Sequence, residues 1–450
     1  MATAIRQGTV APPPPGPPRH FYVGHLPDYR RDPLGYCTRC AREYGDVVAL
    51  RFFHFPYYLV SRPDLIEDVL VTHHKGFTKS VDYRLWLRAV LGDGLLTSED
   101  GLWRRRRELA QPAFHHDRIA TYAEVMAACT DRMLRGWATG DVRNVHGDLM
   151  HLTLQIVASV LFGADIDREA EDVEHALAVV MRHAAEWSAF PVPLFFPTPA
   201  NLRWKRALRR LDEVVDGIIR ARRRGGADRG DLLSMLISGR DESGRPMNDR
   251  EIRDEVMTIV LAGHETTAVA LSWTFSLLSQ HPAAEAALWA EVDGATADRL
   301  PNAADLPRLH YTGWVVKEAM RLFPPVWAIG REARTDGTIG GFRLRKKTQV
   351  FVSPYVVHRD PRWFPGPGEF RPERWADGLE QRLPRFAYFP FGGGPRHCIG
   401  HGFATTEAVL VLAAIARRFQ LRIVPDRPAV PYPTITLRPK DGMWMTITRR

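Results

Sequence analysis

Apolar residues recur at a spacing of three to four along most of the chain, a pattern that predicts helices. The predicted helices are Asp32–Tyr44, Pro63–His73, Gly101–Ala113, Ala120–Gly163, Asp167–Ala189, Arg203–Arg223, Asn248–Gln280, Ala283–Thr296, Leu309–Leu322 and Phe403–Arg418. The longest of them is Asn248–Gln280, which His281 and Pro282 close. At about 1.5 Å per residue it is long enough to cross a whole domain.

Strands are expected where β-branched and aromatic residues cluster. Val47–Phe53 and Tyr57–Ser61 predict a hairpin, and short strands are expected within Gly330–Ser353 and Phe419–Arg450. The segments that favour loops or linkers, or that are ambiguous, are Val81–Leu96, Phe190–Ala200, Arg224–Gly230 and Arg359–Gly378. The chain is therefore predicted to be mainly α with a minor β-sheet region.

The 450 residues alone would suggest about three domains. Composition is that of a soluble globular protein, and no linker separates the motifs described below. We therefore expect a proline-rich N-terminal segment over residues 1–20 and a single large domain over residues 21–450. The first segment has no apolar core, so we expect no membrane anchor and a cytoplasmic protein. We also expect the protein to be a monomer.

The net charge of +9 would suit a nucleic acid, a membrane surface or an acidic protein partner. No arginine cluster is interleaved with aromatic residues in a known nucleic-acid-binding pattern, which disfavours nucleic acid. The four cysteines, Cys37, Cys40, Cys129 and Cys398, are too few for a disulfide framework and suit a reducing compartment. Cys37 and Cys40 have the spacing of half a zinc site or of a redox pair. No second pair or histidine lies nearby for zinc, and no strand precedes them as in thioredoxin-like folds, so they are expected to be ordinary helix residues.

One glycine-rich stretch carries Cys398 to the start of the last predicted helix. The positive end of a helix and its free N–H groups lower a thiol pKa, so this sulfur is expected to be a thiolate. Phe391 can shield the sulfur from water, Arg396 can meet a carboxylate, and glycines ending at Gly394 let the backbone approach a flat group. These features fit an axial haem ligand, whereas an isolated cysteine would favour a structural role. Every position of Phe-x-x-Gly-x-Arg-x-Cys-x-Gly is filled, through to Gly400.

This stretch resembles the haem-binding loop of the cytochrome P450 family. The resemblance implies the cytochrome P450 fold, in which one large domain encloses haem b between a long central helix and the cysteine loop. It also implies that Cys398 is the iron ligand and that Phe391, Gly394, Arg396 and Gly400 belong to the cofactor-binding loop.

The long predicted helix contains Ala262-Gly-His-Glu-Thr-Thr267, whose glycine and threonines are poor helix formers. The Thr266 hydroxyl can bond the carbonyl of Ala262 and bend the helix, which would leave a groove beside Glu265. Taken alone, the motif could equally be a polar interruption of a buried helix. Its match to the family's oxygen-activation motif implies that Thr266 and Glu265 deliver protons to dioxygen.

Glu318 and Arg321 are three residues apart on one helix face, which is a weak signal by itself. Arg374, in the later motif Phe370–Trp375, could complete a buried network with them. The order of these motifs before Cys398 resembles the same family. It implies a structural network that fixes the loop leading to the cysteine.

Trp103 and Arg107 are four residues apart, and arginine grips carboxylates well. By resemblance, Trp103, Arg107, Arg331 and Arg396 hold the haem propionates. The neighbouring run Arg104–Arg106 is either a solvated face or a docking patch for an acidic electron donor.

Phe195 and Phe196 lie in a proline-broken segment, where they are either plain core or an apolar lid over a pocket. By resemblance, the residues that face the substrate are Leu261, Ala262, Val326 and Ala328.

The resemblance covers nearly the whole chain and implies a haem-thiolate monooxygenase. Such an enzyme inserts one atom of dioxygen into an apolar organic substrate, by hydroxylation or epoxidation. No flavin or iron–sulfur segment is found, so we expect an external ferredoxin and ferredoxin reductase. The alternatives are a haem-thiolate peroxygenase or isomerase, and a non-enzymatic haem-binding sensor. The acid–alcohol pair argues against the first, and the lack of a signalling or DNA-binding segment argues against the second.

Overall fold

The computed structural model describes residues 11–81, 83–163, 170–189, 193–225, 228–296 and 299–450. The chain forms two compact units. The first comprises residues 1–81, 328–367 and 383–397, and the second comprises residues 82–327, 368–382 and 398–450.

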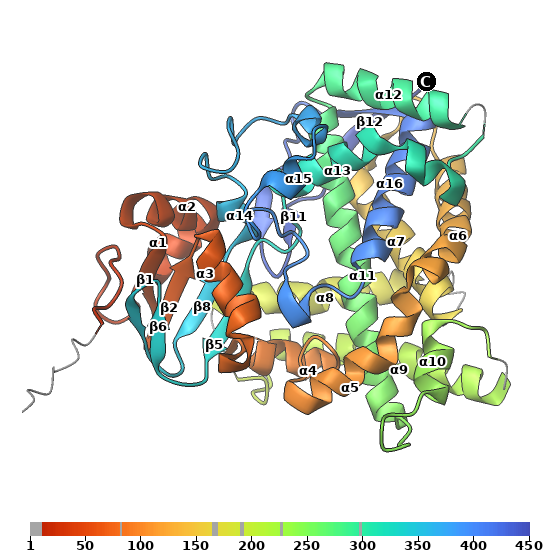
Figure 1. Ribbon diagram of the computed structural model, residues 1–450. Helices are drawn as coiled ribbons and strands as arrows, with labels where there is room; N and C mark the ends of the chain where they lie inside the picture. The colour runs from red at the N-terminus through yellow and green to blue at the C-terminus, as the bar shows by residue number, and fades with distance from the viewer. Residues whose placement is uncertain (1–10, 82, 164–169, 190–192, 226–227, 297–298) are drawn as a thin grey trace, which may run out of the picture. The chain divides into compact units, whose positions relative to one another are not determined.

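The first unit is built on a five-stranded sheet with the order β1-β2-β8-β5-β3 (Figure 1). β1 (Val47–Phe52) and β2 (Phe55–Val60) form the predicted hairpin. β8 (Gln349–Val352) pairs parallel to β2, and β5 (Ile329–Ala333) pairs antiparallel to β8. β3 (Phe77–Lys79) closes the sheet beside β5. The strands expected within residues 330–353 are therefore confirmed.

The other elements of the first unit are helices and short strands. They are α1 (Leu26–Arg31), α2 (Pro33–Tyr44), α3 (Pro63–Glu67), η1 (Asp68–Thr72), η2 (His74–Gly76), β6 (Gly337–Ile339), β7 (Phe342–Leu344), α14 (Pro354–Val357) and η7 (Gly394–Arg396). The described part of the proline-rich segment joins the same unit, since Ala49 N–H donates to Pro15 O over 2.7 Å.

Cys37 and Cys40 are buried on α2, where they pack against Val48 and Leu59 of the hairpin. Burial raises the pKa of both thiols, that of Cys40 to about 11. They are core side chains, as expected from the sequence.

The second unit holds most of the helices. They are η3 (Tyr83–Leu87), α4 (Arg88–Leu91), α5 (Asp100–Ala110), η4 (Gln111–Phe114), α6 (His116–Arg135), α7 (Val145–Phe162), α8 (Ala170–Ala189), α9 (Pro199–Gly225), α10 (Leu232–Ser238), α11 (Asp249–Leu278), α12 (Pro282–Thr296), η5 (Ala303–Arg308), α13 (His310–Leu322), η6 (Pro372–Trp375), α15 (Leu379–Arg382) and α16 (His401–Arg418). Its strands are β4 (Val142–Asn144), β9 (Phe419–Ile423), β10 (Pro431–Pro433), β11 (Leu437–Pro439) and β12 (Trp444–Arg449). Figure 1 shows α11 passing through the middle of this unit, with α7 and α16 beside it.

Two predictions about the helices of this unit were wrong. The single helix expected over Ala120–Gly163 is two helices, because the chain turns at Gly140, which has a left-handed φ of 94°, and then forms β4. Both helices have the same apolar period, so the period does not reveal the turn. Helix α10 was not predicted; Asp231 caps it by accepting from Ser234 N–H. The predicted loop Phe190–Ala200 includes residues 190–192, which lie outside the described part of the chain.

Helix α7 has the length and composition of a membrane-spanning helix, with a mean hydropathy of 1.3. However, 67% of it is buried inside the protein, where it packs against α11 and α6. It is therefore a core helix of the second unit.

The Glu318 carboxylate is fully buried and joins α13 to η6. It accepts from Arg321 Nε at 3.0 Å and Nη2 at 2.9 Å, and from Arg374 Nε at 2.8 Å. It also accepts from Trp375 Nε1 at 2.9 Å and from Arg371 N–H at 3.1 Å. The three-residue network expected from the sequence is present. The tryptophan and the backbone donor complete it, so that several hydrogen bonds compensate the buried charge.

We predict that Glu318→Ala lowers the free energy of unfolding by about 3–5 kcal/mol, because it leaves two arginines buried without their acid. The matched control is Lys317→Ala on the same helix, which removes a partly exposed ion pair with Glu380. This control should cost less than about 1 kcal/mol. Chemical denaturation of the three proteins measures both effects, and equal costs for the two variants would contradict the role given to Glu318.

Candidate functional site

Helix α11 is buried along most of its 30 residues, but it opens in one place. Ala262 is exposed, and Gly263 and Thr266 are half-buried, so that they form an open stripe on the helix. The Thr266 hydroxyl donates to Ala262 O over 2.7 Å, which confirms the contact predicted from the sequence. Since this bond occupies the hydroxyl hydrogen, the oxygen lone pairs are left to accept a hydrogen bond at the open stripe.

Glu265 is buried and turned toward the C-terminal part of the chain. Its Oε1 accepts from Thr436 Oγ1 over 2.7 Å. Burial raises the pKa of this carboxyl, against the opposing effects of the Thr436 hydroxyl and the Arg438 charge. Neighbouring helix residues point about 100° apart, so Glu265 does not share the face of Thr266. The expected groove with both groups side by side is therefore corrected to an acid and an alcohol on different faces.

Cys398 lies three residues before the first residue of α16, and its side chain is exposed to solvent. The protein packed around the sulfur nevertheless removes enough water to raise its pKa. The N–H of Gly400 and the charge of Arg107 act in the opposite direction, with smaller effects. The expectation that the helix end alone makes a thiolate is thus wrong. A coordinating metal would deprotonate the sulfur outright.

The residues of the second unit fit a haem in three respects. Cys398 offers one reachable sulfur, and Arg107 on α5 is close enough for each group to influence the pKa of the other. Trp103 lies one helical turn before Arg107 and is half-buried. The open stripe at Thr266 leaves room on α11 for a ligand.

Of the other predicted cofactor residues, Gly400 belongs to the second unit and the rest belong to the first. Arg331 lies on β5, is buried, and donates from Nη1 to Gly330 O over 3.0 Å. Phe391 and Arg396 are half-buried, Arg396 at the end of η7.

The glycines before the cysteine are needed for contacts within the protein. Gly394 has a φ of 68°, and a Cβ there would lie 2.0 Å from the carbonyl oxygen of Leu70. A Cβ on Gly393 would lie 2.2 Å from the ring of Phe386. From the sequence, these glycines were expected to let the backbone approach a flat cofactor. In the structure, contacts within the protein already require a residue without a side chain at both positions.

The residues predicted to face the substrate differ in burial. Leu261 is buried, whereas Val326 and Ala328 are half-buried. The segment around Val326 is held by the C-terminal strands, since Leu437 N–H donates to Pro325 O over 2.9 Å. Phe195 and Phe196 are exposed, so they are not core residues.

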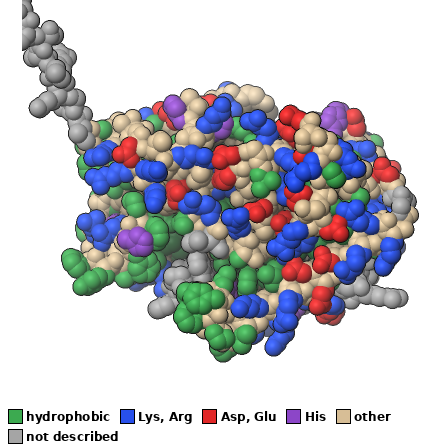
Figure 2. All heavy atoms as spheres, turned by 90° about the horizontal axis from the view of Figure 1, so that it is seen from below, with side chains coloured by type: hydrophobic (Ala, Val, Ile, Leu, Met, Phe, Trp, Pro, Cys, Tyr) green, Lys and Arg blue, Asp and Glu red, His purple; other side chains and the backbone are tan. Residues whose placement is uncertain are grey.

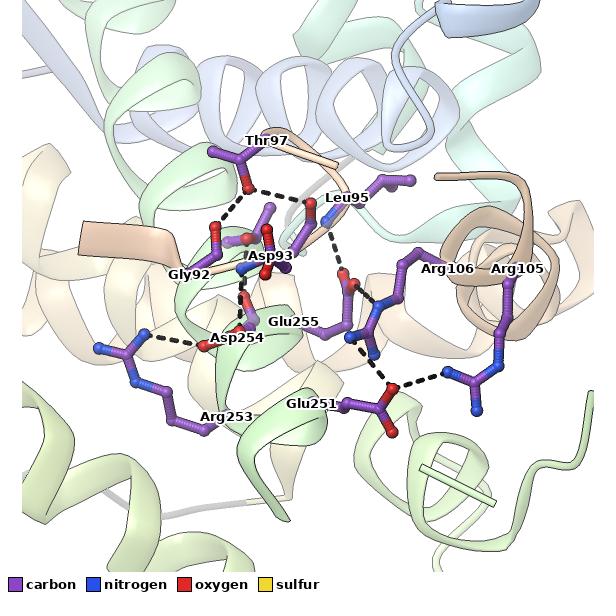
Figure 3. A network of polar contacts seen from close by, with 12 residues as sticks. Gly92, Asp93, Leu95, Thr97, Arg105, Arg106, Glu251, Arg253, Asp254 and Glu255 are labelled. Carbon is purple, nitrogen blue, oxygen red and sulfur yellow. Dashed lines mark hydrogen bonds and ion pairs between the residues drawn. The ribbon is translucent and has the colours of Figure 1, made fainter. Parts of the chain in front are cut away.

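Arg105 and Arg106 are not free surface charges. Arg105 Nη1 lies 2.9 Å from Glu251 Oε1, and the nearly fully buried Arg106 lies 3.5 Å from Glu251 and 3.4 Å from Glu255 (Figure 3). Arg105 and Arg106 were expected to form either a docking patch or a solvated face, and both predictions are wrong. Arg104 is the one member of the run that remains exposed.

The same network holds α5 and the preceding loop against α11. Leu95 N–H donates to Glu255 at 3.1 Å, and Asp93 N–H donates to Asp254 at 2.9 Å (Figure 3). The network therefore positions Trp103 and Arg107 relative to α11. This network could not be predicted from the sequence, because its partners are roughly 150 residues apart along the chain. The one sequence feature that pointed to it was the pair Glu251 and Glu255, one turn apart on the long helix.

A second buried acid, Glu407, lies on α16 nine residues after the cysteine. Burial raises the pKa of its carboxyl to about 8, against a smaller lowering effect of Thr267. Neither carboxyl oxygen makes a hydrogen bond of normal geometry to any described residue, and the Thr267 hydroxyl makes none either. Glu407 is therefore neutral over much of the physiological range. No sequence motif pointed to Glu407.

One further cluster could hold a metal ion. His115, His116 and Asp117, at the start of α6, bring three ligand atoms within 4.8 Å of one another. All three side chains are exposed, and the cluster has no part in the site described above.

Comparisons with known proteins identify what the chain resembles. A family model described as Cytochrome P450 matches residues 14–445. The crystal structure of the cytochrome P450DA heme domain superimposes with a TM-score of 0.89 at 29% sequence identity, over 98% of each chain.

Three curated proteins are similar over most of their length. Cyclooctatin synthase of Streptomyces melanosporofaciens is 41% identical over 92% of this chain and 91% of that protein. Cyclooctat-9-en-7-ol 5-monooxygenase of the same organism is 36% identical, over 90% and 88%. Pentalenene oxygenase of Streptomyces avermitilis is 34% identical, over 95% of both.

We predict that Glu407 makes the protein less stable as the pH rises from about 4.5 to about 8. Between the unfolded pKa of 4.5 and the folded pKa of about 8, the folded state binds the extra proton. The free energy of unfolding should therefore fall by up to about 1.4 kcal/mol per pH unit from this group. Glu407→Gln keeps the shape but cannot titrate, so this part of the slope should disappear.

Denaturation of the wild type and of Glu407→Gln across this pH range measures the difference in slope. The control is Glu124→Gln on α6, an exposed acid whose loss should leave the wild-type slope in place. Identical slopes for the wild type and Glu407→Gln would mean that the carboxyl is already ionised in the folded protein.

Proposed function

Because this chain belongs to the cytochrome P450 family and is a monooxygenase, we propose that it oxidises cyclic terpene hydrocarbons or alcohols. The observation that carries the proposal is the similarity to two relatives whose names specify cyclooctat-9-en-7-ol and pentalenene as substrates. An external ferredoxin and ferredoxin reductase would supply the electrons.

The cofactor would be haem b, which supplies the activation of dioxygen. Cys398 would ligate its iron. Its propionates would be held by Trp103, Arg107, Arg331 and Arg396. Phe391, Gly394 and Gly400 would shape the loop around the ligand. We propose that residues 21–450 act as one domain, since the family match runs through both compact units.

Proton handling would fall to Thr266 and Glu265. The Thr266 oxygen, with its hydrogen committed to Ala262 O, would accept a hydrogen bond from water or from a protonated ligand at the open stripe. Glu265 would hold a proton more readily than an exposed glutamate does, because burial raises its pKa. Since the two groups lie on different helix faces, water would carry the proton between them.

The substrate pocket would be lined by Leu261, Ala262, Val326 and Ala328, with Phe195 and Phe196 on a lid segment. These side chains offer no charge, which suits a substrate without ionisable groups. We propose a cytoplasmic, monomeric protein with no membrane anchor and no nucleic-acid partner.

The proposed substrate class is tested by titrating the haem-loaded protein with pentalenene and with a linear fatty acid of similar carbon number. Pentalenene should displace water from the iron and shift the haem absorption, and the fatty acid should do so at least about tenfold more weakly. Turnover with ferredoxin, reductase and reductant should then convert pentalenene into an oxygenated product. Tighter binding and turnover of the fatty acid would overturn the proposed substrate class and leave the monooxygenase assignment intact.

We predict that Thr266→Ala keeps haem binding and reductant consumption but diverts electrons to hydrogen peroxide. Without the hydroxyl as acceptor at the open stripe, the product formed per reductant should fall by roughly tenfold or more. The control is Thr274→Ala, which removes the same type of hydroxyl–carbonyl bond, to Ala270 O, at a buried position of α11. Product, peroxide and reductant are measured in one reaction, and tight coupling in Thr266→Ala would rule out this role.

A further inference from the structure

Two adjacent histidines and an aspartate gather at the turn between η4 and α6. His115 Nδ1 lies 3.3 Å from Asp117 Oδ2, and His116 Nε2 lies 2.8 Å from Asp117 Oδ1. The two imidazole rings are close to each other, with centroids 4.2 Å apart. Among the described residues, this is the one group of three potential metal ligands whose ligand atoms come together. We call it the His–His–Asp cluster.

A change of backbone direction brings these three consecutive residues together. Side chains one or two positions apart on a regular helix do not face each other. His115, however, has extended dihedral angles, with φ −69° and ψ 148°, and α6 begins at the next residue. The break between η4 and α6 therefore allows the His115 ring to reach Asp117 in the first turn of α6.

Two imidazoles and a carboxylate are a suitable ligand set for Zn²⁺ and similar transition-metal ions. Tetrahedral zinc holds nitrogen and oxygen ligands at about 2.0–2.2 Å, which places neighbouring ligand atoms roughly 3.4 Å apart. The distance from His115 Nδ1 to Asp117 Oδ2 is close to this value, and the distance from His116 Nε2 to Asp117 Oδ1 is shorter. All three side chains are exposed, so small rotations can adjust the geometry and water can complete the coordination.

The charges near the cluster act in both directions. The positive end of α6 disfavours a cation. Glu108 and Arg118 line the same surface hollow as His115 and Asp117. The Arg118 guanidinium is held at the neighbouring linker, because its Nη1 donates to Gly230 O over 2.6 Å. Glu108 adds a second carboxylate to that of Asp117, so the acids offset the opposing charges.

The surface of the protein is mostly of another kind. Figure 2 shows one face, on which basic and acidic side chains are mixed and histidines are sparse. Adjacent exposed imidazoles beside a carboxylate are therefore a specific feature, whereas exposed carboxylates beside arginines are common on this chain.

We propose that the His–His–Asp cluster is a surface site for one Zn²⁺ ion or a transition-metal ion of similar ligand preference. Mg²⁺ and Ca²⁺ prefer oxygen ligands and would bind there poorly. The ion would stabilise the folded protein, because the unfolded chain does not hold the three ligand atoms together. It would fix the turn that carries Phe114, whose ring packs against Phe403 of α16 with centroids 6.4 Å apart. The site is independent of the proposed substrate.

Equilibrium dialysis of the untagged, haem-loaded protein against Zn²⁺, followed by metal analysis, tests the proposal. The wild type should retain about one Zn²⁺ per chain, and a roughly hundredfold excess of Mg²⁺ should not displace it. His116→Gln and Asp117→Asn each remove one ligand, so each should weaken binding by about tenfold or more. The matched control is His73→Gln, which alters an exposed histidine that lies 3.7 Å from the single carboxylate of Asp68. This variant should bind Zn²⁺ like the wild type.

Thermal unfolding gives a second measurement. Zn²⁺ should raise the midpoint of unfolding of the wild type and of His73→Gln, and should raise it less in His116→Gln and Asp117→Asn. The haem absorption of each variant without Zn²⁺ verifies that it is folded. Failure of the wild type to retain Zn²⁺ would overturn the proposal. So would equal losses of binding in His73→Gln and His116→Gln, which would indicate an adventitious ion only.

Discussion

A helix that is buried nearly along its whole length can open to a ligand only where small side chains leave space. Helix α11 meets this constraint at Ala262 and Gly263, and the bond from Thr266 to Ala262 O satisfies the hydroxyl hydrogen at that opening. The rest of the second unit is arranged around this helix. α7 and α16 pack against it, and the ion pairs from Glu251 and Glu255 hold α5 beside it. The stripe at Ala262 and Gly263 is therefore an opening because these neighbouring elements cover the rest of α11.

Buried acids have two different roles in this unit. Glu318 and Glu255 lie among arginines and backbone donors, so their charges are compensated and they tie segments together. Glu265 and Glu407 each have a hydroxyl nearby and form no ion pair with any described residue, and burial raises the pKa of both. The first kind contributes to structure through charge. The second kind holds a proton more readily than an exposed acid does, which suits an enzyme that consumes protons.

The contacts that the sequence predicted correctly are mostly local or belong to recognisable motifs. The bond from Thr266 to Ala262 follows from helical spacing, and the Glu318 network follows from two motifs in order. The missed contacts depend on tertiary packing: Arg106 meets Glu255 from a distant segment, and Gly394 is required by the Leu70 carbonyl. The pKa of Cys398 was predicted in the wrong direction, because the helix end was considered without the water removed by the surrounding protein. The roles of the site residues still rest on family resemblance.

The central claim is that this chain uses dioxygen to insert one oxygen atom into an organic substrate. The most direct test is a turnover in isotopically heavy dioxygen with ordinary water, ferredoxin, ferredoxin reductase and reductant, followed by mass spectrometry of the product. The account predicts that each new oxygen in the product carries the heavy isotope and that product formation requires the reductant. Unlabelled oxygen in the product, or a rearranged product without new oxygen, would contradict it and favour a peroxygenase or an isomerase.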